Sequence, residues 1–288
     1  MGASAYLAHK NGAHRHSNFI EHTFGETAAG SRSSADFGYA PSPGPQTASS
    51  LRLSARSPSL PAMATFVLIH GAGDVGWYWH LTEAELQARG HHTIAPDLPC
   101  DNDTASLDDY AAAAVEAAGG RQDLVIVGQS YGAFTATLAA SQLPVRLLVL
   151  LAGMIPAPGE SPGEWWASTG YRQAAGQQAK LDGGKTGHDD PRISFYNGVP
   201  RPLAEEALRR GGRGESGAVW NTPWPLDAWP DVPTRFILCQ DDQFFPAAFM
   251  RRLAWQRLGT VPDEVPGCHC AALSHPGELS DLLVSYLG

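Results

Sequence analysis

Short apolar runs that show little alternation with polar residues recur along the chain from residue 65 onward. A strand with this pattern is buried on both faces, as in a parallel sheet that helices cover from both sides. Helix-like stretches separate these runs, and they predict an α/β fold with a mainly parallel sheet of about six strands and helices on both faces. The expected strands are 65–70, 92–97, 123–128, 145–153, 234–239 and 261–265, and the expected helices are 77–90, 106–118, 131–142, 247–258 and 276–287.

Two segments depart from this alternation. Residues 1–62 are rich in Ser, Ala, Gly and Pro without helical or strand periodicity, so we expect a disordered extension, and a domain that spans 63–288. Residues 154–232 hold weak helices, Pro-rich joints and five of the eight tryptophans, which predicts a helical cap inserted over the sheet. Trp165 and Trp166 in this cap are candidates to line an apolar substrate pocket.

Composition excludes several classes of protein. The formal net charge of −9 argues against a nucleic-acid-binding surface. No apolar run approaches the roughly 18 residues of a membrane span, and the N-terminal segment lacks the apolar stretch of a signal peptide. Four cysteines form no disulfide framework in a chain of 288 residues, and Cys268 and Cys270 lack a second pair at zinc spacing. We therefore expect a cytoplasmic protein that binds no metal and no cofactor.

The pentapeptide Gly-Gln-Ser-Tyr-Gly at 128–132 follows an expected strand and precedes an expected helix. This is the arrangement of a nucleophile elbow, in which a tight turn exposes a serine hydroxyl at the carboxyl edge of the sheet. Side chains at the two flanking glycines would collide with neighbouring backbone. Ser130 is therefore the candidate nucleophile, and the N–H of Tyr131, directly after it, is a candidate oxyanion donor.

A nucleophilic serine needs a base and an acid that orients the base, and in this fold class they follow the serine in the order acid, then histidine. Asp241 and Asp242 follow the strand at 234–239, and His269 and His275 follow the last strand. Since Pro276 places His275 at the start of the final helix, the loop residue His269 is the better candidate for the base. These residues leave both aspartates open as the acid.

Four motifs of the chain are FVLIHGAGDVGWYW, VGQSYGAF, CQDDQFFPAAFMRR and GCHCAALSHPGEL. Together they resemble the α/β-hydrolases, in particular the small esterase branch that includes plant methyl esterases and hydroxynitrile lyases, and related actinobacterial hydrolases. The resemblance covers 64–288 and implies that the proline four residues after the acid selects Asp242. It further implies that the N–H of Ala72, in the loop after the first strand, is the second oxyanion donor. His70 lies beside this loop, and we expect its side chain to fix the loop through a structural hydrogen bond.

The resemblance implies a serine hydrolase that cleaves esters or lactones of small, largely apolar substrates through an acyl-enzyme, acting as a monomer or a homodimer. A hydroxynitrile lyase on the same scaffold is one alternative. Plant lyases of this type carry Thr after the first histidine and Lys after the catalytic histidine, whereas this chain has Gly71 and Cys270, which disfavours that alternative. A ligand-binding receptor on the same fold stays open as an alternative. The Gly-rich segment 71–76 lacks the acidic partner of a dinucleotide site, so no such cofactor is expected.

Overall fold

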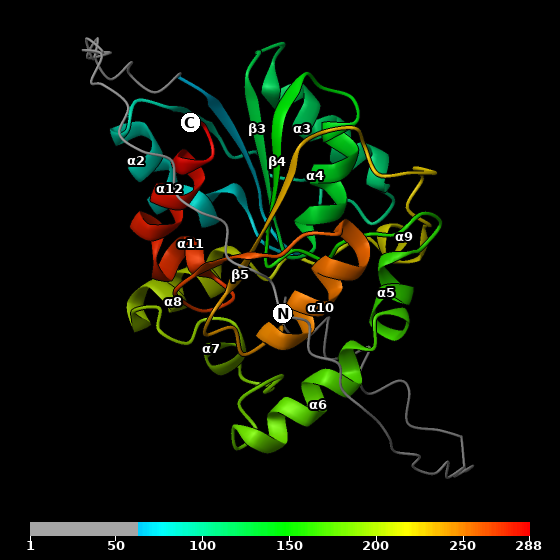
Figure 1. Cartoon of the computed structure of the whole chain (residues 1–288), viewed down its shortest axis with the longest axis vertical. Helices are drawn as coiled ribbons and strands as arrows, with labels where there is room; N and C mark the ends of the chain where they lie inside the picture. Colours follow the sequence, from blue (N-terminus) through cyan, green and yellow to red (C-terminus); the bar gives the residue numbers. More distant parts are fainter. Residues whose placement is uncertain (1–62) are drawn as a thin grey trace, which may run out of the picture.

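The structure is a computed structural model that describes residues 63–288, and the predicted extension 1–62 lies outside the described residues. Six strands form one fully parallel sheet in the order β2-β1-β3-β4-β5-β6 (Figure 1). The predicted α/β fold is thereby confirmed. The strands are β1 Thr65–Ile69, β2 His92–Ile94, β3 Leu124–Gln129, β4 Val145–Leu151, β5 Thr234–Cys239 and β6 Asp263–Val265.

Helices cover both faces of the sheet because successive side chains of each strand point to opposite sides. In β1, Val67 and Ile69 join one core cluster, whereas Phe66 and Leu68 join the other. Helices on the two sides complete these two cores (Figure 1). The first core takes α3 Leu107–Ala118, α4 Gly132–Ala140 and α10 Ala247–Leu258, and the second takes α2 His80–Ala88, α11 Ala271–Ser274 and α12 Pro276–Ser285.

Local sequence signals set several helix ends. Ser106 accepts a hydrogen bond from the N–H of Asp109, whose carboxylate accepts the N–H of Ser106 in return, so the expected N-cap is a full capping box. The helix expected over 77–90 begins instead with a 3-10 turn, η1 Gly76–Trp79. The strand expected over 92–97 ends at Ile94. The backbone of the next residue, Ala95, lies against Gly76, and a Cβ on Gly76 would lie 2.1 Å from the carbonyl oxygen of Ala95.

Five helices and no strand lie between β4 and β5 in the described chain, and they gather around one end of the sheet (Figure 1). Two helices of this insertion, α5 Pro162–Ser168 and α6 Tyr171–Leu181, are separated at Gly170, whose φ of +72° is a left-handed conformation that interrupts a helix. Glu160 and Arg257 join this insertion to α10 through a 2.7 Å ion pair. The other three helices are α7 Pro191–Ser194, α8 Arg201–Arg210 and α9 Gly217–Asn221.

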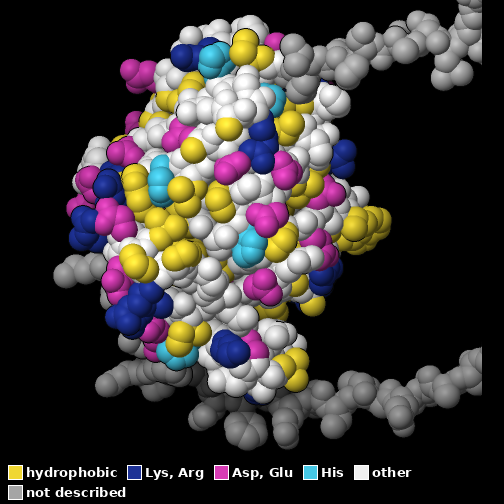
Figure 2. Space-filling view, turned by 90° about the vertical axis from the view of Figure 1, so that its left-hand side faces the viewer, with side chains coloured by type: hydrophobic (Ala, Val, Ile, Leu, Met, Phe, Trp, Pro, Cys, Tyr) yellow, Lys and Arg dark blue, Asp and Glu magenta, His cyan; other side chains and the backbone are white. Residues whose placement is uncertain are grey.

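Charges of both signs are interspersed on the face shown in Figure 2, and no continuous basic patch gathers there. On α8, for example, Arg201 pairs with Glu205 at 2.7 Å and Arg210 pairs with Glu206. Among residues 63–288, no helix is long and apolar enough to cross a membrane.

The turn from β3 into α4 leaves no space for side chains at its glycines. A Cβ on Gly132 would lie 2.4 Å from the carbonyl oxygen of His70, and one on Gly128 would lie 2.6 Å from the Cβ of Ala136. The first contact is with the end of β1 and the second is with α4. A Cβ would therefore collide with its neighbours at both glycines that flank Ser130.

Gly132→Ala is expected to lower the free energy of unfolding by about 2–4 kcal/mol, because its Cβ meets backbone that cannot move aside. Gly176→Ala is the control, since Gly176 lies inside α6 with nothing within 4 Å of its built Cβ. That variant should gain about 0.5–1 kcal/mol from helix propensity. Urea denaturation measures both, and equal effects of the two substitutions would contradict the close contact at Gly132.

Candidate active site

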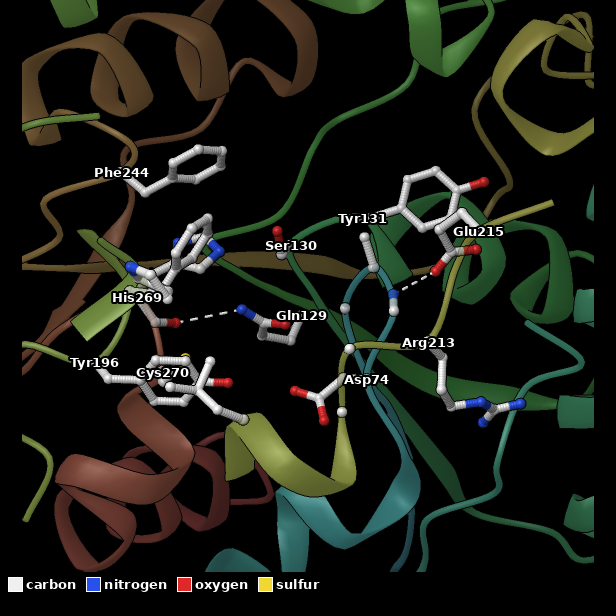
Figure 3. A pocket seen from close by; sticks show the side chains of 18 of the residues that line it. Asp74, Gln129, Ser130, Tyr131, Tyr196, Arg213, Glu215, Phe244, His269 and Cys270 are labelled. Atoms are coloured by element: carbon white, nitrogen blue, oxygen red, sulfur yellow. Dashed lines mark hydrogen bonds between the residues drawn. The ribbon is translucent and has the colours of Figure 1, made fainter. Parts of the chain in front are cut away.

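Ser130 stands between β3 and α4 with a φ of +52°, a left-handed conformation that costs energy for any residue except glycine. The end of β4 holds it there. The N–H of Ser130 donates to the carbonyl of Leu151 at 3.0 Å, and its own carbonyl accepts from the N–H of Met154 at 2.9 Å. The side chain therefore leaves the sheet edge and points into a cavity (Figure 3).

The cavity has a volume of about 420 Å³ and lies between the carboxyl ends of the strands and the cap. The oxyanion loop, residues 71–74, the turn at Ser130 and the loop that carries His269 supply one side of it. The cap supplies the other side. The apolar lining of the cavity includes Phe244 from the loop after β5, and from the cap Met154, Trp166, Phe195, Leu208 and Trp220.

His269 and Asp242 form a buried pair in which Nδ1 of the imidazole lies 2.8 Å from Oδ2 of the carboxylate. The other carboxylate oxygen, Oδ1, accepts the N–H groups of Phe244 and Phe245 at 2.7 and 2.9 Å. An Nδ1–H that donates to Asp242 leaves the lone pair on Nε2, and Nε2 has no hydrogen-bond partner within the described residues. Ser130 lines the same cavity as His269, although no hydrogen bond joins their side chains in the structure.

The two alternative residues lie elsewhere. Asp241 is exposed, and its Oδ2 accepts the N–H of Gly267 at 3.2 Å, which holds the two loops together. His275 is the first residue before α12, and its Nδ1 lies 3.0 Å from the hydroxyl of Ser274. Neither side chain is among those that line the cavity. The geometry therefore brings Asp242 and His269 together and leaves Asp241 and His275 outside.

Three phenylalanine rings surround the imidazole of His269 and shield it from water. The ring centroids of Phe195, Phe244 and Phe245 lie 5.2–5.3 Å from that of the imidazole, each in an edge-to-face arrangement. Hydrogen bonds and charges in such a low-dielectric surrounding are stronger than in water. The aromatic wall thus strengthens the bond that orients the imidazole.

Two backbone N–H groups in the wall of the cavity are candidates for an oxyanion site. Ala72 and Tyr131 both line the cavity, and the N–H of neither donates a hydrogen bond to any described residue. Free backbone donors beside a nucleophile are the components of an oxyanion hole. Both N–H groups are therefore available for this role, which stays a prediction.

His70 fixes the oxyanion loop, as the sequence indicated. Its Nδ1 lies 2.9 Å from the carbonyl oxygen of Gly71, and its Nε2 accepts the N–H of Leu98 at 3.1 Å. Since Nε2 is the acceptor, the proton is on Nδ1 and the ring is neutral. Burial lowers the pKa of His70 to about 4, so it stays neutral at physiological pH.

The two candidate tryptophans of the cap differ in position. Trp166 lines the cavity, as predicted. Trp165 does not, and it is fully buried, with its indole N–H donating to the carbonyl of Ile155 at 3.0 Å. Neighbouring residues of a helix point about 100° apart, so only one of the pair reaches the cavity. The expectation that Trp165 lines the pocket is therefore wrong, and this residue holds the cap in place.

Several polar residues of the cavity, Gln129, Asp74 and Glu215 among them, were not expected from the sequence. Gln129 donates from Nε2 to the carbonyl of His269 at 3.3 Å, and its place inside the pentapeptide was an available signal. Asp74 follows the oxyanion loop, and burial raises the pKa of its carboxyl to about 7. Glu215 belongs to a Gly-rich stretch of the cap that gave no sign of a role.

Among residues 63–288, no group of three or more His, Cys, Asp or Glu side chains could hold a metal ion. Cys270 lines the cavity beside His269, but burial raises the pKa of its thiol well above the ordinary value. A protonated thiol is a poor nucleophile, which leaves Ser130 as the candidate in this cavity.

Comparison with known families agrees with this geometry. Residues 66–282 match the model of the "Alpha/beta hydrolase family". The chain belongs to this family. Among curated members, it is 34% identical over 253 residues to the probable esterase PIR7A of Oryza sativa subsp. indica, an alignment that covers 76% of this chain and 95% of the rice protein. It is 33% identical over 248 residues to methylesterase 7 of Arabidopsis thaliana, across 76% of this chain and 94% of that protein.

Two solved structures share the fold. Polyneuridine aldehyde esterase superposes with a TM-score of 0.66 at 20% identity, covering 78% of this chain and all of the other. A pyrethroid hydrolase from Sphingobium faniae JZ-2 gives a TM-score of 0.62 at 21% identity and covers 78% of this chain and 98% of that chain.

The low pKa of His70 predicts a loss of stability in mild acid. The unfolded chain takes up a proton near the ordinary pKa of 6.5, whereas folded His70 stays neutral down to about 4, so stability falls as the pH drops between these values. Relative to His70→Gln, the wild type should lose about 2 kcal/mol more of unfolding free energy between about pH 7.5 and about pH 5. Urea denaturation at both pH values measures this difference, and parallel losses in the two proteins would contradict a buried neutral His70.

Proposed function

We propose that this protein is a serine carboxylesterase that hydrolyses esters or lactones of small, largely apolar substrates. The observation that carries the proposal is the 2.8 Å bond between His269 and Asp242, which leaves Nε2 unpartnered in the cavity that Ser130 lines. The relatives named esterase and methylesterase support the same reaction class. The domain that does this work is 63–288, with 154–232 as its cap.

In the proposed reaction, Ser130 Oγ attacks the ester carbonyl carbon while His269 Nε2 takes the hydroxyl proton. The carbonyl oxygen becomes an oxyanion that accepts hydrogen bonds from the N–H groups of Ala72 and Tyr131. His269 then gives its proton to the leaving alkoxy oxygen, and the acyl group stays on Ser130. Water, activated by His269 in the same way, releases the acid and restores the serine.

Asp242 has two roles in this scheme. Its hydrogen bond holds the imidazole in the tautomer that presents a lone pair to Ser130, and its charge stabilises the imidazolium that forms. The backbone N–H groups of Phe244 and Phe245 hold the carboxylate itself, so the bond to His269 has a fixed direction.

The cavity favours a small substrate. A volume of about 420 Å³ accommodates a ligand of modest size, and aromatic side chains of the cap, Trp166 among them, form much of its wall. The cap therefore selects the acyl or alcohol group, while the loops of the sheet carry out the reaction.

The four free, buried cysteines support a reducing, cytoplasmic location for the protein.

Steady-state hydrolysis of a panel of p-nitrophenyl esters and lactones tests the proposal. Ser130→Ala and His269→Ala should each lower kcat by at least about 10³-fold, and the double variant should be little worse because the residues act as one unit. Asp242→Asn should lower kcat by roughly 10²–10⁴-fold, because the asparagine favours the wrong tautomer of the imidazole.

Asp241→Asn and His275→Ala are the matched controls, since each lies near a proposed catalytic residue but outside the cavity. They should keep kcat within about threefold of the wild-type value. A severe loss in either control would move the catalytic role to that residue. Turnover of no ester or lactone by the wild type would favour a ligand-binding receptor instead.

A further inference from the structure

A short segment of the cap, residues 211–216, lies directly against the oxyanion loop, and we refer to it as the strap. It joins α8 to α9 and contributes Arg213 and Glu215 to the cavity wall (Figure 3). The N–H of Gly73 donates to Oε1 of Glu215 at 2.6 Å, and the carbonyl of Gly73 accepts the N–H of Arg213 at 3.0 Å. Both backbone polar groups of Gly73 are thus bound to the strap.

The contact between the strap and the loop is too close for any residue other than glycine. Gly73 has a φ of +65°, and a Cβ on it would lie 2.4 Å from the carbonyl oxygen of Arg213. The loop therefore has little freedom to shift while the strap is in place.

The strap is itself bound to the body of the domain. Oε2 of Glu215 accepts the hydroxyl of Tyr110, from α3, at 2.6 Å. The hydroxyl of Ser216 donates to the carbonyl of Ala105 at 2.6 Å. The guanidinium of Arg213 lies 2.9 Å from the carboxylate of Asp101. The bond to Tyr110 holds the carboxylate of Glu215 itself, and the other two bonds hold its neighbours in the strap, so the carboxylate is a rigid acceptor for the Gly73 N–H.

We infer that Glu215 is a positioning residue for the oxyanion site, because it fixes Gly73 and thereby the N–H of the preceding residue, Ala72. The inference rests on the proposed esterase function. A donor stabilises an oxyanion only if it already points at the site where the charge develops, and a displaced donor loses most of this effect. A hydrogen bond from a backbone N–H to a carboxylate is also stronger than one to a neutral acceptor. The cap thereby contributes to the chemistry as well as to the choice of substrate.

The test compares Glu215→Ala with Glu215→Gln, which keeps an acceptor oxygen for Gly73. Glu215→Ala should lower kcat by roughly 10–100-fold with KM within about threefold, because removal of a complete oxyanion donor costs about 10²–10³-fold. Glu215→Gln should recover most of this loss. Glu205→Ala is the control, since it removes a glutamate of the cap that pairs with Arg201 at 2.7 Å and does not line the cavity.

Inhibitor binding separates positioning of the oxyanion donor from a general loosening of the fold. With a trifluoromethyl ketone, Ser130 Oγ adds to the carbonyl carbon, the proton passes to His269, and the ketone oxygen becomes an oxyanion in the same site. The Ki for this ketone should rise in Glu215→Ala by the factor by which kcat/KM falls. The Ki for the matched methyl ketone, which binds without a stable oxyanion, should stay within about threefold, and Glu205→Ala should change neither.

Two results would overturn the inference. One is a kcat for Glu215→Ala within about threefold of the wild-type value. The other is an equal loss of affinity for both ketones, which would mean that only the shape of the pocket had changed. If Ser130→Ala is inactive while Glu215→Ala is fully active, the esterase function stands and the role of Glu215 fails. A wild type without turnover overturns both.

Discussion

The left-handed turn at Ser130 is the constraint on which the site depends. A φ of +52° at a non-glycine residue persists only where its surroundings hold it, and here the ends of three neighbouring strands do so. The last residue of β4, Leu151, and Met154 just after it bond to the N–H and the carbonyl of Ser130. The end of β1 lies so close to Gly132 that a Cβ there would not fit. The strain places the hydroxyl at the carboxyl edge of the sheet, where the loops that follow the other strands meet it.

The site is built from those loops and from the cap. The loop after β5 carries Asp242, the loop after β6 carries His269, and the loop after β1 carries Ala72. The cap lies over all three, supplies apolar walls such as Trp166, and reaches down to Gly73 through Glu215. A rearrangement of the cap would therefore alter both the shape of the pocket and the direction of the Ala72 N–H, the proposed oxyanion donor.

Sequence reasoning was strong where one residue type has one physical reason to be present. The uninterrupted apolar runs predicted the parallel sheet, and the two glycines that flank Ser130, Gly128 and Gly132, predicted the tight turn. It was weak where the direction of a side chain decides the role. Trp165 and Trp166 are adjacent, and only their positions on α5 separate a core residue from a pocket residue. Glu215 lies 142 residues from Gly73, so no local pattern connected them.

Covalent labelling of Ser130 tests the central claim most directly. With a fluorophosphonate, Ser130 Oγ forms a bond to phosphorus, fluoride leaves, and the serine proton passes to His269. Peptide mass spectrometry of the labelled wild type should find the adduct on the tryptic peptide that contains Ser130, with labelling at least about 10²-fold slower in His269→Ala. A folded wild type that stays unlabelled, or that carries the adduct on another residue, would contradict Ser130 as the nucleophile.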